Sequence, residues 1–96
     1  MPIQSFTTSE LQEFYETGKV PKKAEWQKIK KIVARKFDML DYAHVLEDLR
    51  SPPGNKLEAL KNDLTGLHSI RVNDQWRIVF EWTLQGPAKV RVIDYH

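Results

Sequence analysis

The first half of the chain shows the three-to-four-residue periodicity of amphipathic helices. Residues 9–17 place Leu11, Phe14 and Tyr15 on one face, with Thr7–Ser9 as possible caps and Gly18 where a helix C-terminus is expected. A longer apolar stripe then predicts a core helix, and its members are Trp26, Ile29, Val33, Phe37 and Leu40. After it, Asp41 is expected to cap a short third helix that carries Ala43, Leu46 and Leu49 inward.

The second half alternates apolar and polar positions, which is typical of strands. The Ser-Pro-Pro-Gly-Asn stretch at 51–55 excludes a helix or a central strand, because two prolines remove backbone donors. Strands are predicted over 57–60, 68–73, 75–82 and 88–93, with the last hairpin turn at Gln85–Pro87. In the third of them Trp76, Ile78, Phe80 and Trp82 share a face that must be buried. Helices followed by an antiparallel meander predict an α+β domain over residues 1–96, with the helices on one sheet face and the other face open and polar.

Composition narrows the function classes. The 96 residues suffice for one core, and the absence of cysteine excludes disulfides and thiolate chemistry. No apolar run is long enough for a membrane span and the start lacks the features of a signal peptide, so a cytoplasmic location is expected. The three histidines, His44, His68 and His96, lack ligand spacing and the glycines stand alone at turns, so we predict no metal and no nucleotide cofactor.

Positive charge is concentrated in one segment. The net charge is +2, but residues 22–36 hold seven cations against Glu25 alone. They are Lys22, Lys23, Lys28, Lys30, Lys31, Arg35 and Lys36. Such a segment favours a polyanion such as nucleic acid, or an acidic protein, and the alternative is an ordinary solvated helix face.

The polar side of the predicted sheet carries residues that suit phosphate chemistry. Arg71 and Arg77 come from adjacent strands, so they are expected to lie close together with an anion between them, bordered by Glu58 and Lys61. The final strand leads into Asp94, Tyr95 and His96, three side chains able to handle protons. Cleaving a phosphodiester needs a base, an acid and cations, and RNA supplies its own nucleophile in the 2′-hydroxyl. The alternative is that each of these polar side chains is an ordinary exposed residue.

Three segments carry specific motifs. They are residues 46–61, which include Arg-Ser-Pro-Pro-Gly-Asn, residues 69–78, which include Asn-Asp-Gln-Trp-Arg, and residues 92–96, which end in Asp-Tyr-His. With these motifs the chain resembles the HigB toxins of bacterial type II toxin-antitoxin systems, which belong to the RelE-like superfamily and are also called plasmid maintenance killer proteins. The resemblance covers essentially the whole chain. It implies a microbial-RNase-type α+β fold and an mRNA interferase that enters the ribosomal A site, cuts the messenger there and arrests translation.

The resemblance also implies residue roles. His96 would be the general acid or base, with Asp94 and Tyr95 placing it or the RNA, Arg77 holding the scissile phosphate and Lys61 assisting with charge. Some relatives have histidine where this chain has Glu58, so a histidine role cannot be transferred. Glu58 would either act as a base or orient a partner. The expected RNA contacts are Arg71, Asn73, Glu58 and Gln75.

The implied partners are messenger RNA and a small helix-turn-helix antitoxin of the HigA kind, which neutralises the toxin and represses the shared operon. From charge we add ribosomal RNA, held by Lys22, Lys23, Lys28, Lys30 and Lys31. No membrane partner is expected. Direct DNA binding is not expected either, because no helix carries base-reading side chains. The main alternative to an enzyme is a non-catalytic RNA- or protein-binding module in which the terminal triad is structural, and a DNA-binding regulator is a third.

Overall fold

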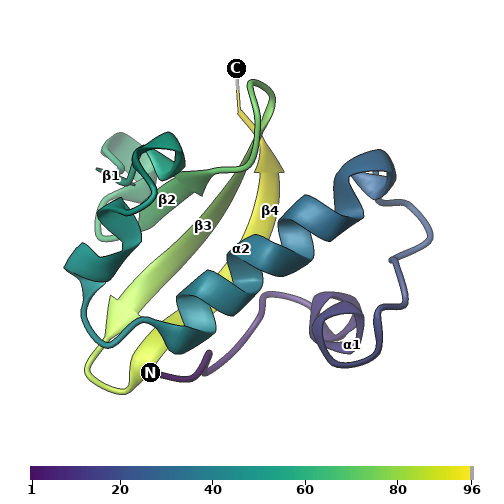
Figure 1. The fold of residues 1–96 in the computed structure, drawn as a ribbon, viewed down its shortest axis with the longest axis horizontal. Helices are drawn as coiled ribbons and strands as arrows, with labels where there is room; N and C mark the ends of the chain where they lie inside the picture. The colour runs from purple at the N-terminus through teal and green to yellow at the C-terminus, as the bar shows by residue number, and fades with distance from the viewer. Residues whose placement is uncertain (96) are drawn as a thin grey trace.

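A computed structural model describes residues 1–95 and contains two α-helices on one face of a four-stranded sheet (Figure 1). The elements are α1 (Ser9–Thr17), α2 (Lys30–Tyr42), β1 (Glu58–Ala59), β2 (His68–Arg71), β3 (Trp76–Thr83) and β4 (Gly86–Asp94). The strands follow one another in the order β1-β2-β3-β4 and every neighbouring pair is antiparallel. The predicted fold class is therefore confirmed. Within the described residues, no helix is both long enough and apolar enough to cross a membrane.

The core lies between α2 and the sheet. Val33, Phe37 and Leu40 of α2 are fully buried and belong to one cluster with the sheet residues Ile70, Ile78, Phe80 and Val90. The Phe37 ring also has aromatic neighbours outside the sheet, with centroid distances of 5.3 Å to Phe6, 6.1 Å to Phe14 and 5.9 Å to Tyr15. Helix α1 and the N-terminal segment are thus packed onto α2 through one aromatic group.

Helix α1 has the bounds and the caps expected from the sequence. The Thr8 hydroxyl accepts a hydrogen bond from the Leu11 backbone N–H at 3.2 Å, and Gly18 ends the helix with φ of 84°. Leu11 and Phe14 are buried. Local chemistry sets the bounds of this element, because a side-chain acceptor satisfies the first turn and a residue without a Cβ adopts the left-handed end.

The second helix begins later than its apolar stripe. Gln27–Ile29 form a 3-10 turn, and α2 starts only at Lys30. No side chain caps either start. Trp26 instead leaves the helical line and packs its ring against Phe14, 5.0 Å away. Tertiary packing of the indole has therefore prevailed over the periodicity.

The expected cap at Asp41 is wrong. Helix α2 runs on to Tyr42, so Asp41 lies inside it and its carboxylate accepts the Ile3 backbone N–H at 2.9 Å. The third helix is reduced to a 3-10 helix over Leu46–Arg50. Its cap comes from Asp48, whose carboxylate accepts the backbone N–H groups of His44 and Val45 and thereby lowers the pKa of Asp48.

The proline-rich loop is held by a buried polar pair. Pro53–Asn55 form a single 3-10 turn, a short helix that the two prolines were expected to exclude. The Asn55 side chain is fully buried; its Oδ1 accepts the Lys36 ammonium at 2.5 Å, and its Nδ2 donates to the carbonyls of Leu49 at 3.1 Å and Ser51 at 3.3 Å. Burial, followed by the charges of Arg35 and Arg71, lowers the pKa of Lys36. One of the seven cations is therefore structural.

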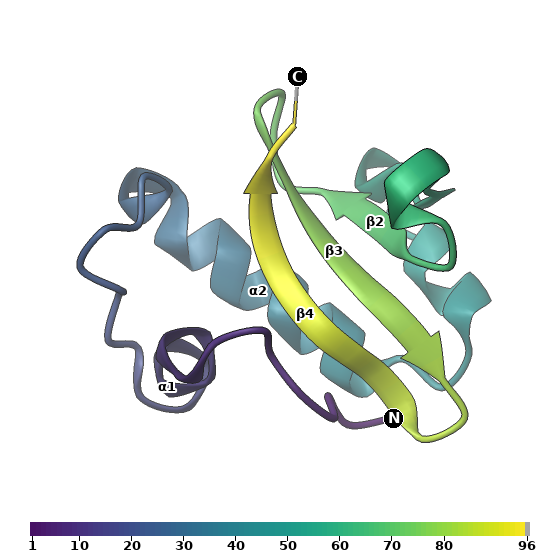
Figure 2. The same cartoon turned by 180° about the vertical axis from the view of Figure 1, so that it is seen from behind.

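The face of the sheet away from α2 is only partly open. Trp76, Ile78 and Phe80 are buried on the helix side as predicted, whereas Trp82 is only half-buried there. On the other face Ser69 and Val79 are fully buried and Arg77 is 7% exposed, which corrects the expectation of an open, polar face. The Arg77 side chain lies over this face, because its Nε donates to the Ser69 hydroxyl at 2.8 Å. Figure 2 views this side, where β3 and β4 run uncovered by either α-helix.

The last hairpin turns one residue earlier than predicted. Thr83 pairs with Gly86, so the turn is Leu84–Gln85, and Gly86 and Pro87 already belong to β4. Proline is tolerated there because β4 is the last strand of the sheet. The Pro87 carbonyl accepts the Gln4 N–H at 2.7 Å, and the N-terminal segment continues alongside with a parallel bridge between Phe6 and Val90. The first residues of the chain thus partly cover this edge.

Candidate phosphate-binding site

Three predicted site residues meet on the face away from α2. The Tyr95 hydroxyl donates to Glu58 Oε1 at 3.1 Å, and the Arg77 guanidinium carbon lies 5.3 Å from the centre of the Tyr95 ring. Arg77 Nε is 3.9 Å from the same Glu58 oxygen. Residues from β1, β3 and the end of β4 are therefore brought together, although Glu58 and Tyr95 are far apart in sequence.

Arg77 is fixed in orientation by neutral oxygens. Its Nε donates to the Ser69 hydroxyl at 2.8 Å, and its Nη2 donates to the Lys56 carbonyl at 2.5 Å. A guanidinium carries five N–H donors, so these bonds leave several donors available. Within residues 1–95, Nη1 makes no hydrogen bond. The arginine is thus preorganised, with a free donor edge for an anion.

A pocket of about 280 Å³ adjoins this group. Glu58, Lys61 and Tyr95 are its polar and aromatic walls, and Ala59, Leu60, Asn62 and Leu64 complete the lining. The volume is close to the lower end of small-ligand sites, about 300 Å³. It therefore suits a single ring or phosphate group. The predicted Lys61 lies beside Glu58 in this wall, with its side chain exposed to solvent.

The environment of Tyr95 keeps its phenol protonated. The hydrogen bond to Glu58 and then the negative charge of Glu58 raise the pKa of Tyr95, and Arg77 acts in the opposite direction. At neutral pH the hydroxyl is therefore a hydrogen-bond donor. Its present acceptor is the Glu58 carboxylate, so these two side chains orient one another.

Gln75 and Asp94 support the end of the chain. The Gln75 carbonyl accepts the Tyr95 N–H at 2.6 Å, and its side-chain amide donates to Asp94 Oδ2 at 3.1 Å. Trp76 pairs with Asp94 in the β3–β4 ladder. The backbone of Gln75 thus holds Tyr95, and its side chain holds the preceding Asp94. Among the described residues, Gln75 and Asp94 lie next to the site without lining its pocket.

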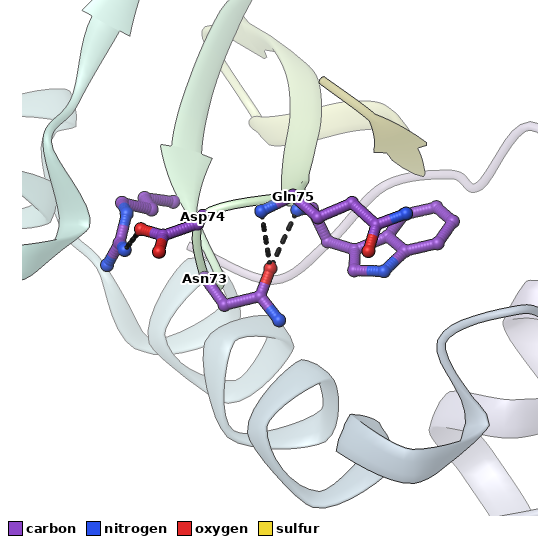
Figure 3. Close-up of polar contacts among 5 residues, drawn as sticks. Asn73, Asp74 and Gln75 are labelled. Atoms are coloured by element: carbon purple, nitrogen blue, oxygen red, sulfur yellow. Dashed lines mark hydrogen bonds and ion pairs between the residues drawn. The ribbon is translucent and has the colours of Figure 1, made fainter. Parts of the chain in front are cut away.

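Arg71 and Asn73 take part in other interactions (Figure 3). Arg71 is the register partner of Arg77, as predicted, but it forms an ion pair with Asp74. Asn73 Oδ1 accepts the backbone N–H groups of Gln75 at 2.9 Å and Trp76 at 2.8 Å, which closes the β2–β3 turn. The expected anion between Arg71 and Arg77 is not required, because each arginine already has a carboxylate neighbour.

The remaining predicted residues are His96 and the five lysines of the basic segment. His96 is outside the described residues, so its role stays a prediction. The five proposed ribosome-binding lysines are all exposed; they are Lys22, Lys23, Lys28, Lys30 and Lys31. In both Figure 1 and Figure 2 the start of α2 and the end of β4 lie toward the same, upper end of the molecule.

Sequence reasoning missed Arg91. It pairs with Val79 across the β3–β4 ladder, and Arg77 pairs with Ile93, so Arg91 and Arg77 share a sheet face. The alternation in β4 contained this signal, since positions 91, 93 and 95 fall on one side. No cluster of three His, Cys, Asp or Glu side chains suited to a metal occurs within residues 1–95.

Comparisons with known proteins identify the family. The profile of the family described as "RelE-like toxin of type II toxin-antitoxin system HigB" matches residues 4–96. Toxin HigB-1 of Vibrio cholerae is 41% identical over 86 residues, covering 90% of this chain and 88% of that protein. An uncharacterized protein of Haemophilus influenzae is 37% identical over 79 residues, covering 82% and 77% of the two chains.

Solved structures support the same fold. A YoeB/ParE toxin from Agrobacterium tumefaciens superposes with a TM-score of 0.55 at 22% identity and covers 100% of both chains. The YoeB-YefM complex from Staphylococcus aureus gives the same score and identity, covering 100% of this chain and 97% of that one. Together with the sequence matches, these findings show that the chain belongs to the HigB toxins of the RelE-like superfamily.

Proposed function

We propose that this toxin is an mRNA endoribonuclease that cleaves the messenger in the ribosomal A site. The observation that carries the proposal is the Arg77 group. Its guanidinium is held by Ser69 and the Lys56 carbonyl, with Glu58 and Tyr95 beside it. A fixed, planar guanidinium edge beside a lysine-lined pocket suits a phosphodiester, because its two non-bridging oxygens share one negative charge and can both accept from the fork.

The proposed reaction uses the 2′-hydroxyl of the RNA. The 2′-oxygen forms a bond to phosphorus while the bond from phosphorus to the 5′-oxygen breaks. One proton leaves the 2′-hydroxyl and another reaches the departing 5′-oxygen, so the products are a 2′,3′-cyclic phosphate and a 5′-hydroxyl. In this scheme Arg77 and Lys61 stabilise the negative charge on the phosphate oxygens.

The proton carriers are assigned as follows. His96 is the general acid or base, and Asp94 and Tyr95 position it or the RNA. Glu58 is assigned the orienting role rather than that of the base, because one of its oxygens is already engaged by the Tyr95 hydroxyl at 3.1 Å. The RNA reaches Arg77 past the Tyr95 ring, since the arginine is only 7% exposed.

The proposed setting follows from the family. A type II toxin acts together with an antitoxin, for which we propose a helix-turn-helix protein of the HigA kind. One structure with the same fold is a YoeB-YefM complex. Ribosomes and messenger RNA are the other proposed partners. Because they occur in the cytoplasm, we propose that the toxin acts there.

The proposal is tested with purified ribosomes programmed with a defined messenger. Wild-type protein is expected to create new RNA 5′ ends at codons in the A site, with 5′-hydroxyl and cyclic-phosphate termini. A messenger with 2′-deoxyribose at the cut position is expected to resist cleavage there. His96→Ala is expected to bind the ribosome and leave the messenger intact. Binding without cleavage by the wild type would support the non-catalytic module instead.

The basic segment supplies a separate prediction. Lys30 and Lys31 lie in the first turn of α2, which contains no acidic residue. Cations at this positive helix end each cost about 0.3–1 kcal/mol, so their presence is best explained by a polyanionic partner. Lys30→Glu with Lys31→Glu is therefore expected to weaken ribosome binding by about tenfold or more, with weaker salt dependence. The thermal midpoint is expected to be unchanged or higher.

The matched control reverses two other exposed lysines. Lys19 and Lys89 already face Glu13 at 3.9 Å and Glu81 at 3.5 Å, so Lys19→Glu with Lys89→Glu makes the same change in net charge elsewhere. Ribosome binding is measured by co-sedimentation over a salt series. Equal losses in the two double variants would mean that overall charge, and not the α2 segment, determines binding.

A further inference from the structure

We infer that Arg91 is a second phosphate-binding residue, which holds the RNA backbone beside the phosphate at Arg77. The inference rests on the proposed endoribonuclease function and extends its substrate site onto β4. Neither the family resemblance nor the sequence pattern had singled out this residue.

The register of β3 and β4 determines where Arg91 lies. Arg77 pairs with Ile93, and Arg91 is two residues before Ile93 on the same strand. Residues related in this way are diagonal neighbours on one sheet face, about 7–8 Å apart between Cα atoms. This separation is comparable with that of neighbouring phosphates along an extended RNA strand, so one strand can contact both arginines.

Charge distinguishes Arg91 from the other cations of the sheet. Arg71 pairs with Asp74, Arg77 lies beside Glu58, and Lys89 faces Glu81. Within residues 1–95, Arg91 has neither an ion pair nor a hydrogen bond from its side chain, although it is partly buried. A partly desolvated guanidinium without a counter-charge is unfavourable, and an anion from outside removes that cost.

The surroundings favour RNA as that anion. Arg91 shares its face with the Arg77 group and the adjoining pocket, and β3 and β4 are uncovered by either α-helix on this side (Figure 2). The guanidinium fork matches two phosphate oxygens at once. An RNA strand that places one phosphate at Arg77 therefore continues over β4 toward Arg91. An acidic protein segment is the other possible occupant, and the test separates the two.

Binding is measured with a short single-stranded RNA that carries 2′-O-methyl groups and so cannot be cleaved by 2′-attack. Arg91→Ala is expected to weaken binding by about tenfold and to reduce the slope of log affinity against log salt by about 0.7. Arg91→Gln, which keeps most of the aliphatic stem, is expected to lose as much. Arg91→Lys is expected to lose less.

Arg35→Ala is the matched control. Arg35 is exposed on α2, which covers the opposite face of the sheet, and its removal changes net charge equally. It is expected to leave the affinity for the short RNA unchanged. In cleavage assays Arg91→Ala is expected to raise KM while kcat stays within about twofold, because the lost contact holds the bound RNA and the transition state equally.

Equal affinities for Arg91→Ala and Arg35→Ala would overturn the inference, as would a lower kcat at unchanged affinity. Loss of antitoxin binding by Arg91→Ala with normal RNA binding would assign the residue to the protein partner and overturn it too. The RNA used for binding is uncleavable, so these outcomes are read independently of activity. Absence of any cleavage by the wild type would instead refute the proposed function.

Discussion

Replacing Arg77 with lysine is expected to lower kcat for messenger cleavage by about 100-fold or more, the range found when one preorganised charge-stabilising donor is removed. The ammonium keeps the positive charge but cannot donate to the Ser69 hydroxyl and the Lys56 carbonyl while presenting a planar edge to phosphate. The measurement is single-turnover cleavage on programmed ribosomes.

Two controls show whether the loss of activity is specific to the Arg77 guanidinium. Arg50→Lys makes the same chemical change at an exposed arginine that pairs with Glu47 at 2.6 Å, and it is expected to be fully active. Circular dichroism must show that the Arg77→Lys protein is folded, because Arg77 is almost completely buried. A folded Arg77→Lys protein with near-normal kcat would remove the guanidinium from the chemistry.

Replacing Asn55 with alanine is expected to destabilise the fold by about 3 kcal/mol, the largest effect on stability that we predict. The change removes the present partner of the buried Lys36 ammonium, of the buried Leu49 carbonyl and of the partly buried Ser51 carbonyl. Each unsatisfied buried group costs about 1–3 kcal/mol, and a charged group more. Urea unfolding of the two proteins measures the difference.

A double variant separates pairing from packing. Lys36→Met with Asn55→Leu replaces both partners by apolar groups, and it is expected to recover part of the lost stability because no charge stays buried. If Asn55→Ala costs less than about 1 kcal/mol, water must replace the amide at this position. Loss of the loop is also expected to reduce cleavage, because the Lys56 carbonyl that holds Arg77 follows Asn55 directly.

Elements defined by local chemistry could be predicted from the sequence. The Thr8 cap, the Gly18 stop and the burial of Trp76, Ile78 and Phe80 on one face of β3 depend on residues a few positions apart, and all three are confirmed. The position of Asp48 was missed because carboxylates at several nearby positions can reach the same backbone donors. The predicted start of the second helix was wrong at Trp26, because its ring packs against Phe14 instead of continuing the helix.

The site was harder to predict, because its contacts join distant parts of the chain. Periodicity placed Arg71 opposite Arg77 correctly, but it could not show that Asp74 neutralises one and Glu58 approaches the other. The burial of Lys36 depends on Asn55, the last residue of the proline-rich stretch at 51–55 and 19 residues away in sequence. Residue chemistry pointed to Glu58, Lys61 and Tyr95 and the family resemblance supported them, but only the folded chain shows the hydrogen bond from Tyr95 to Glu58.

The pairing of the N-terminal segment with β4 has a consequence for the order of events during translation. Phe6 has its bridge partner at Val90, so this contact cannot form until residue 90 has been synthesised and has left the ribosome. Until then α1 and α2 have no complete sheet to cover, and Tyr95 cannot lie over Arg77. Folding therefore waits for long-range contacts that residues 90–95 make. A ribosome making this chain can meet the assembled Arg77 group only after these residues have emerged from it.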